Sequence, residues 1–297
     1  MCRGVRMSGQ EKNQKGPSRR SASVRQRLKN IRGYMFDLDG TLVLGDKNLN
    51  GYRALPGAHE IVALLGERGL PFLTFTNGST KTPAQLSQAL AQAGFDIPPE
   101  RALTPISVAV EVFRRKQYRR ILALGVEGVW RPLADAGLDV IVSPRRADGI
   151  DAVLLGWHPA FTVADLEAAS HAVWAGAGLY TASSVPYIAS RDGRALGISG
   201  ALSAAMRSIT GKRAIVVGKP SINALRMVGD RLGIPPEQLA IVGDDPALEN
   251  AMAHKGGALS VAVHTGLYGA DDFNRLPQGL RPHLSLPGVE QLLQLIR

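Results

Sequence analysis

The chain has 297 residues, of which 45% are hydrophobic and 20% charged, a balance typical of a globular protein with one large or two smaller domains. Its single cysteine, Cys2, excludes an internal disulfide and a cysteine-cluster metal site, and it is compatible with a reducing cytoplasm, the location that we expect. Residues 168–190 carry no charged side chain, but their serines, glycines and His171 make them too polar for a membrane-spanning helix. We therefore expect no membrane association.

The net charge of +10 is concentrated at the N-terminus. Residues 1–32 hold ten Lys and Arg side chains against the single acid Glu11, so the rest of the chain carries only +1. This near-neutral body removes most of the support for nucleic-acid binding by the folded part of the chain. The polar, basic composition of 1–32 predicts a mostly disordered tail with a short helix over 24–31. The tail is open to three interpretations: a solubilising extension, a targeting presequence, or an arm that binds a polyanion.

From residue 33 onward, short apolar runs alternate with stretches of helical periodicity. The apolar runs predict strands over 33–37, 71–76, 120–124, 152–156, 179–182, 214–218, 239–244 and 260–264. The helical periodicity predicts helices over 58–68, 83–93, 108–115, 163–175, 200–209, 221–232 and 247–255. This alternation indicates an α/β fold with a mainly parallel sheet. Ligands of such sheets bind beyond the carboxyl ends of the strands.

Side chains capable of chemistry gather at those strand ends. They are Asp37 and Asp39 after the first strand, Thr76, Asn77 and Gly78 after the second, Lys219 after the strand over 214–218, and Asp244 and Asp245 at the end of the strand over 239–244. Two unit charges about 4 Å apart repel by roughly 4 kcal/mol at an effective dielectric of 20, so several carboxylates need a cation. Their oxygen atoms favour Mg²⁺. Lys219 and the backbone amides then suit an anion, which points to phosphoryl chemistry.

The motifs closely resemble the signatures of the haloacid dehalogenase-like (HAD) hydrolase superfamily, in the same order. The matching segments are Phe36-Asp37-Leu38-Asp39-Gly40-Thr41-Leu42, Thr76-Asn77, Lys219 and Gly243-Asp244-Asp245. The best fit is to subclass IIA, which has a large C2-type cap and includes 4-nitrophenylphosphatases, phosphoglycolate phosphatases, pyridoxal phosphate phosphatases and nucleotidases. The resemblance implies a Rossmann-like core over 33–104 and 196–297, with an inserted α/β cap over 105–195. Caps of this kind often mediate dimers, so a homodimer through the cap is compatible with the sequence.

The resemblance also implies a reaction, the Mg²⁺-dependent hydrolysis of a small phosphorylated metabolite. Asp37 matches the nucleophile that forms an aspartyl-phosphate, and Asp39 matches the general acid and base. Lys219 would pair with Asp37 and the phosphate, while Thr76 and the backbone amides near Asn77 and Gly78 would hold the phosphoryl oxygens. The implied Mg²⁺ ligands are the carboxylates of Asp37 and Asp244 and the main-chain carbonyl of Asp39.

The sequence departs from the family pattern at two places. Glu249 stands where an aspartate is common, which indicates either a tolerated substitution, with Asp245 sharing the role, or altered metal binding. Ser183 and Ser184 replace a Thr-Asn pair and the acid that follows is missing, so substrate contacts cannot be transferred there. These departures motivate an alternative function: a weak or inactive member that acts as a regulatory protein, with a basic tail that binds a polyanion. A dehalogenase is disfavoured because it needs neither Asp39 nor Mg²⁺.

Overall fold

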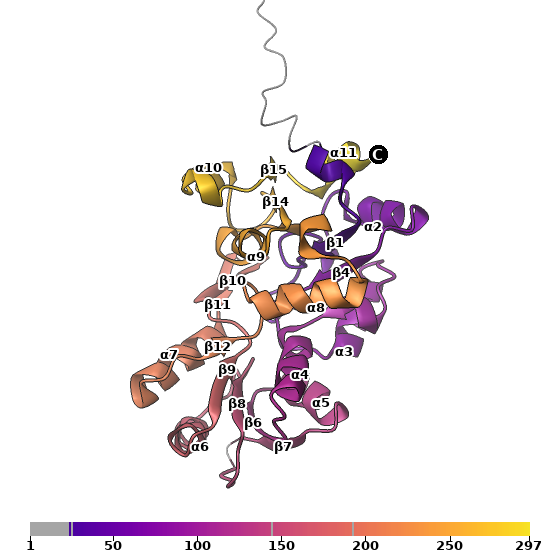
Figure 1. Ribbon diagram of the computed structural model, residues 1–297. Coiled ribbons are helices and arrows are strands. Elements are labelled where there is room, and N and C mark those ends of the chain that lie inside the picture. Colours follow the sequence, from indigo (N-terminus) through magenta and orange to yellow (C-terminus); the bar gives the residue numbers. More distant parts are fainter. Residues whose placement is uncertain (1–23, 25, 144, 192) are drawn as a thin grey trace, which may run out of the picture.

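The computed structural model of the chain describes residues 24, 26–143, 145–191 and 193–297, and within this part the strands build a larger and a smaller parallel sheet (Figure 1). The larger sheet has the order β15-β14-β13-β1-β4-β5. Its strands are β1 (Gly33–Phe36), β4 (Phe72–Phe75), β5 (Ala102–Leu103), β13 (Leu239–Gly243), β14 (Leu259–Val263) and β15 (Leu284–Leu286). Because β1 lies between β13 and β4, the residues that follow these strands meet at one edge of the sheet.

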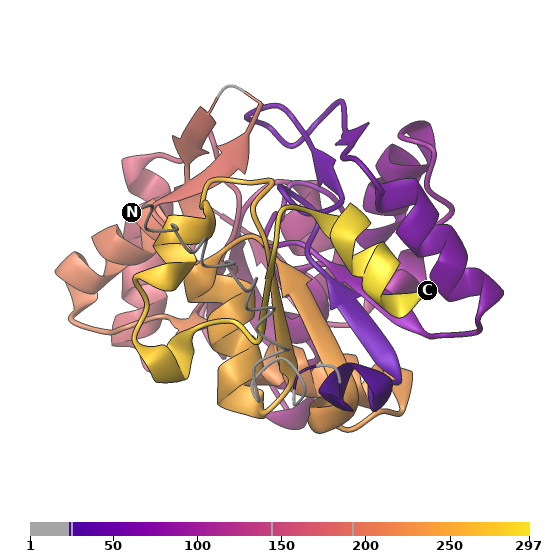
Figure 2. The same cartoon turned by 90° about the horizontal axis from the view of Figure 1, so that it is seen from above.

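Helices cover both faces of the larger sheet, because successive side chains of a strand point to opposite sides. Tyr34 and Phe36 of β1 share one apolar cluster with α2, α3 and α11, whereas Met35 shares another with α8 and α9. Viewed from above, α2 and α11 lie side by side (Figure 2). The helices of this lobe are α2 (Ala58–Glu67), α3 (Pro83–Gln92), α8 (Ile222–Leu232), α9 (Ala251–Gly256), α10 (Ala270–Asn274) and α11 (Val289–Ile296).

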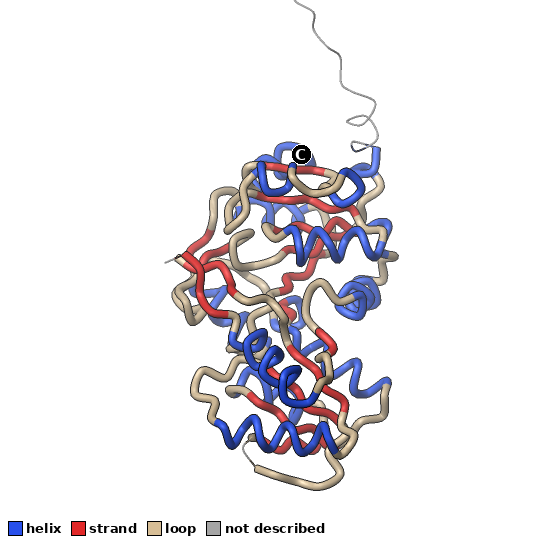
Figure 3. The backbone as a smooth tube through the Cα atoms, turned by 90° about the vertical axis from the view of Figure 1, so that its left-hand side faces the viewer, coloured by secondary structure: helices blue, strands red, loops and turns tan. Residues whose placement is uncertain are grey.

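The smaller sheet has the order β12-β9-β8-β6-β7 and forms a second lobe (Figure 3). Its strands are β6 (Arg120–Leu124), β7 (Asp139–Val142), β8 (Ala152–Leu155), β9 (Gly178–Thr181) and β12 (Ile215–Val216). One face packs against α6 (Val163–Trp174) and α7 (Ile198–Thr210), and the other against α4 (Pro105–Arg115) and α5 (Glu127–Asp135). Since α4 also contacts α8, one apolar cluster continues from this lobe into the larger one.

Two antiparallel hairpins and several short helical turns complete the described chain. The hairpins are β2 (Val43–Leu44) with β3 (Arg53–Ala54), and β10 (Tyr187–Ser190) with β11 (Gly193–Leu196). In Figure 1 the second hairpin lies between the two lobes. The turns are η1 (Pro99–Arg101), η2 (Pro236–Gln238), the π-helical η3 (Pro246–Asn250) and η4 (Gln278–Leu280).

The predicted strands lie within two residues of observed ones, and the α/β class is confirmed. Three of the missed elements have identifiable reasons: α5 contains Pro132, and neither β7 nor β11 has a buried residue or a long apolar run. The strand before Lys219 pairs with β9 of the smaller sheet, so this sheet extends beyond residue 195, the boundary expected for the cap. Residues 26–29 of the predicted helix over 24–31 are helical; most of the predicted tail lies outside the described residues.

Candidate active site

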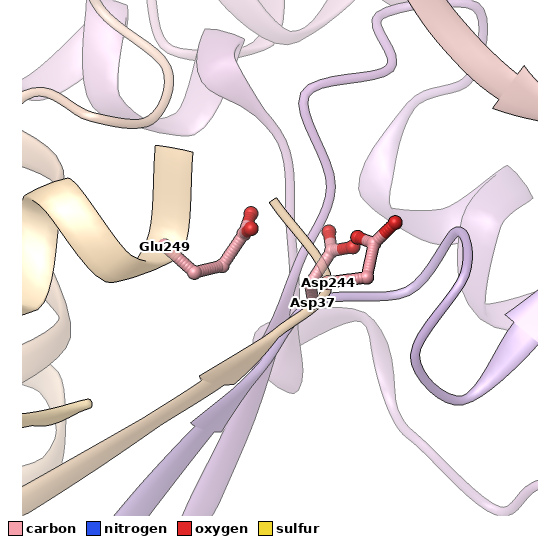
Figure 4. Close-up of side chains that lie close together, drawn as sticks. All are labelled: Asp37, Asp244 and Glu249. Carbon is pink, nitrogen blue, oxygen red and sulfur yellow. The ribbon is translucent and has the colours of Figure 1, made fainter. Parts of the chain in front are cut away.

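The acidic residues predicted at the site follow neighbouring strands of the larger sheet. Asp37 follows β1, and Asp244 follows β13, which pairs with β1 in parallel. Figure 4 shows these two side chains close together at the tips of their strands, with Glu249 pointing toward them from η3. π-Helical turns are frequent at functional sites because they change the direction in which side chains project. Here the turn directs Glu249 into the interior.

A buried lysine connects two of these carboxylates. Nζ of Lys219 contacts Oδ1 of Asp37 and lies 2.6 Å from Oε1 of Glu249. Burial by itself would lower the pKa of Lys219, but the charges of Asp37 and Glu249 raise it above its usual value. The lysine therefore remains an ammonium group and fixes the position of Asp37.

Asp39 has a different environment from Asp37. Its Oδ2 accepts a hydrogen bond from Oγ1 of Thr76 at 3.0 Å, while its buried Oδ1 has no hydrogen-bond partner within the part of the chain that the structure describes. Burial, followed by the charge of Asp37, raises the pKa of Asp39 to about 7, and Thr76 and Lys219 partly oppose this rise. A carboxyl group that titrates near neutral pH can donate a proton in one step and accept one in the next.

Asp244 is held by the loop after β14. Its Oδ2 accepts a hydrogen bond from the backbone N–H of Leu267 at 3.3 Å. A Cβ atom at Gly266 would lie 1.7 Å from the same oxygen, so only glycine permits this close approach. Burial, followed by the charge of Asp37, raises the pKa of Asp244 well above its usual value. The loop thus positions a carboxylate that is costly to ionise without a cation nearby.

Thr76 and Asn77, which follow β4, bind different parts of the site. Oγ1 of Thr76 accepts a hydrogen bond from the backbone N–H of Gly78 at 2.9 Å. The amide of Asn77 instead binds the backbone of Lys219: Oδ1 accepts from its N–H at 2.8 Å and Nδ2 donates to its carbonyl at 3.0 Å. The same Nδ2 lies 3.4 Å from Oγ of Ser183 in the cap. Phosphate binding by the backbone amides of this segment stays a prediction.

The carboxylates fit a hard divalent cation. Among the described residues, one oxygen each of Asp37, Asp244 and Glu249 lies within 4.8 Å of the others, and all three side chains are buried. Lys219 compensates only part of this negative charge, and oxygen donors of this kind are those that Mg²⁺ takes in proteins. Asp37 and Asp244 are the expected carboxylate ligands, and the side chain of Glu249 lies close to both. Coordination by the main-chain carbonyl of Asp39 stays a prediction.

A cavity of about 60 Å³ lies above these groups. Its floor contains the predicted residues Asp37, Asp39, Thr76, Asn77, Gly78, Lys219 and Asp244. Its remaining wall is mostly apolar and was missed by sequence reasoning: Leu49, Val185, Tyr187, Ile188, Leu248 and Leu267. Single apolar residues in loops resemble core residues, so no motif marks them. The phenolic oxygens of Tyr187 and Tyr268, 3.3 Å apart, join the cap hairpin to the loop after β14.

Comparisons with known proteins identify the same family. Residues 34–139 match the family described as haloacid dehalogenase-like hydrolase, and residues 216–292 match a HAD-hydrolase-like family. Human chronophin is 30% identical over 260 residues, which cover 84% of this chain and 86% of chronophin. The chain belongs to the haloacid dehalogenase-like hydrolase family.

Further relatives of this hydrolase are named as phosphatases. The acid sugar phosphatase of Staphylococcus haemolyticus is 29% identical over 241 residues, which cover 81% of this chain and 88% of that protein. The solved structure of a glycerol phosphate phosphatase from Mycobacterium tuberculosis, in complex with magnesium, has a TM-score of 0.78 and 25% identity, and the match covers 91% of this chain and 78% of that one. The predicted superfamily, subclass and Rossmann-like fold are confirmed, and the phosphatase is favoured over the regulatory alternative. No helix among the described residues is both long and apolar enough to cross a membrane.

Proposed function

We propose that this hydrolase cleaves small phosphomonoesters with the help of Mg²⁺, through a phosphorylated Asp37. The observation that carries the proposal is the placement of Asp37: it contacts the ammonium group of Lys219 and shares the site with a carboxyl group, Asp39, whose pKa is about 7. A nucleophile, a cation and a proton donor are thus present in one small cavity. The relatives that are named as phosphatases support this activity.

The reaction proceeds in two displacements. A carboxylate oxygen of Asp37 attacks phosphorus, the bond from phosphorus to the ester oxygen breaks, and Asp39 transfers its proton to the departing alcohol. Water then attacks the aspartyl-phosphate and gives a proton to Asp39, which releases inorganic phosphate and restores both carboxyl groups. Lys219, Thr76 and the backbone amides near Asn77 and Gly78 would hold the phosphoryl oxygens during both steps. For this, the Thr76 hydroxyl must release its hydrogen bond to Asp39, and the Gly78 amide its hydrogen bond to Thr76.

Bound Mg²⁺ would offset the charge of the phosphate as it approaches the carboxylates. We assign its ligands to Asp37 and Asp244, with the main-chain carbonyl of Asp39, and place Glu249 next to them. The carboxylate ligands rest on the cluster of oxygens around Asp37, and the carbonyl of Asp39 rests on the sequence resemblance.

The test is release of inorganic phosphate from a panel of phosphomonoesters, with Mg²⁺ and with EDTA. We expect release that requires Mg²⁺ and that Asp37→Asn reduces by at least ~10³-fold, because the amide cannot serve as the nucleophile. The control is Asp96→Asn, an exposed aspartate that does not line the cavity, which should retain full activity. Release by Asp37→Asn at the wild-type rate would contradict the mechanism.

Three finer assignments accompany the proposal. We infer a cytoplasmic location from the single cysteine and a homodimer through the cap from the sequence resemblance, and both stay predictions. Binding of a polyanion by the basic tail is tested by comparing the elution of the full chain and a variant lacking 1–23 from heparin; identical elution would exclude it.

A further inference from the structure

The wall of the cavity that faces away from the carboxylates is apolar. Leu49 from the loop between β2 and β3, Leu248 from η3 and Leu267 from the loop after β14 contribute three side chains from the larger lobe. Val185 and Ile188 contribute two from the cap, beside the ring of Tyr187. If phosphate occupies the floor between Asp37 and Lys219, the alcohol of the ester must lie against this wall. The inference therefore rests on the proposed function.

Positive charge is scarce in the cavity. Among the described residues that line it, Lys219 is the only cation, and its ammonium group is already engaged by Asp37 and Glu249. The lining also includes the acid Asp245, whose carboxylate accepts a hydrogen bond from the backbone of Ala247. A second anionic group on the substrate would therefore meet carboxylates and apolar side chains without a partner of opposite charge.

Two cations near the cavity, Arg194 and Lys81, are engaged elsewhere. The guanidinium of Arg194 lies 4.4 Å from the centre of the Tyr187 ring, outside the lining. Nζ of Lys81 donates to the carbonyl of Leu49 at 2.6 Å and to Oδ1 of Asn50 at 2.8 Å, which places it behind the loop that carries Leu49. These two side chains support the walls and do not offer an anion site inside them.

We propose that the hydrolase selects phosphomonoesters whose alcohol is uncharged and apolar, such as aryl or alkyl phosphates, and discriminates against esters with a second anion, such as a carboxylate or another phosphate. Burying an unpaired charge against apolar side chains is costly, and like charges placed close together add to that cost. Specificity would then come from the apolar side chains of Leu49, Val185, Ile188 and Leu248.

The first experiment compares two substrates of nearly the same shape, 4-carbamoylphenyl phosphate and 4-carboxyphenyl phosphate, with the full-length wild-type protein and Mg²⁺. They differ by one negative charge on the side of the ring opposite the phosphate. We expect kcat/KM for the carboxamide to exceed that for the carboxylate by at least ~10-fold. Equal values, or a preference for the carboxylate, would overturn the inference while leaving the phosphatase activity established.

Variants at Val185 test whether the apolar wall causes the preference for the uncharged substrate. Val185→Lys adds a cation to the half-buried wall. It should raise kcat/KM for 4-carboxyphenyl phosphate relative to kcat/KM for 4-carbamoylphenyl phosphate by ~10-fold. Val185→Met adds a similar length without charge and should leave the ratio of the two substrates unchanged. A Val185→Lys protein that is folded by circular dichroism yet keeps the wild-type ratio would show that this wall does not set the preference.

Arg194 provides the opposite test, because its guanidinium lies over the ring of Tyr187, which lines the cavity. Arg194→Gln should leave the ratio of the two substrates unchanged if the guanidinium only supports Tyr187. A selective loss of activity toward the carboxylate would identify an anion site and overturn the inference. Failure to release phosphate from both compounds would instead contradict the proposed function itself.

Discussion

Lys219 and Glu249 form a buried ion pair, with Nζ and Oε1 2.6 Å apart, at the position where an aspartate is common in the family. The longer side chain fits because it lies against Gly243 of β13: a Cβ atom at that glycine would be 2.1 Å from Cγ of Glu249. Oε2 of Glu249 also accepts a hydrogen bond from the backbone N–H of Asp245 at 3.2 Å. Glu249 thus fits the site and has defined partners there. This favours the interpretation that glutamate is a tolerated substitution at this position.

We predict that the stability gained from Mg²⁺ increases with pH. Burial is the main cause that raises the pKa of both Glu249 and Asp39, each to about 7 from ordinary values of 4.5 and 3.8. In the metal-free protein these groups therefore contribute stability that is fully present below their unfolded pKa values and is lost as the pH rises to about 7. Mg²⁺ held by Asp37 and Asp244 would stabilise the ionised forms of these neighbouring carboxyl groups and should offset this loss.

The measurement is Tm with Mg²⁺ and with EDTA, at about pH 5.5 and at about pH 8. The sign of the linkage predicts that Mg²⁺ increases Tm more at the higher pH. Asp244→Asn should diminish the increase at about pH 8, because it removes one of the clustered carboxylates. The same increase in Tm at both values of pH would contradict the prediction.

A second prediction concerns Asp39 as the proton donor. Asp39→Asn should lower kcat/KM for an alkyl phosphate by ~10²–10⁴-fold, because an amide cannot protonate the alcohol. The loss should be smaller for 4-nitrophenyl phosphate, whose leaving group needs little protonation. Steady-state kinetics with both substrates gives the ratio, and Asp96→Asn serves again as the control. Equal losses for the two substrates would argue that Asp39 only organises the site around Thr76.

The parts of the site that follow strands could be predicted from the sequence, because each polar motif directly continues a buried apolar run. Asp37 after β1 and Asp244 after β13 are examples. The sheet to which a strand belongs was harder to predict: Ile215 and Val216 read as a strand, but their parallel pairing with Tyr180 and Thr181 depends on tertiary contacts.

The substrate side of the cavity was not predictable in the same way. Tyr187 and Ile188 lie on a hairpin whose strands lack a strong apolar pattern, and they face the site only because the hairpin lies between the lobes (Figure 1). The hydrogen bonds of Asn77 to the backbone of Lys219 also needed the structure. The Thr-Asn motif predicts the location of this residue, but it does not reveal that the side chain binds the backbone of Lys219.

That contact leads to a third prediction, that Asn77 positions the catalytic lysine. Asn77→Ala removes two hydrogen bonds to the backbone of Lys219 and leaves these groups without their partner. We expect the free energy of unfolding to fall by about 1–3 kcal/mol and kcat to fall with it, because the ammonium group shifts away from Asp37. Urea unfolding and phosphate release provide the two readouts. Asn48→Ala, at an exposed position, is the control. An unchanged kcat in a destabilised Asn77→Ala protein would restrict the role of Asn77 to folding.

A fourth prediction uses two glycines of one loop. Gly266→Ala would place a Cβ atom 1.7 Å from Oδ2 of Asp244, so the carboxylate must move and lose its hydrogen bond from Leu267. Gly269→Ala is a matched control because nothing lies within 4 Å of the added Cβ atom and the φ of Gly269 is −91°, which alanine adopts without strain. We expect Gly266→Ala to weaken Mg²⁺ binding by at least ~10-fold, as displacement of a metal ligand or its support typically does.

Isothermal titration of the metal-free proteins with MgCl₂ measures this affinity without relying on turnover. Because Asp244 is buried, the displaced carboxylate in Gly266→Ala should also reduce the increase in Tm that Mg²⁺ produces. Gly269→Ala should match the wild type in both measurements. Wild-type affinity in Gly266→Ala would show that Asp244 can move without weakening Mg²⁺ binding. The assignment of Asp244 as a ligand would then fail.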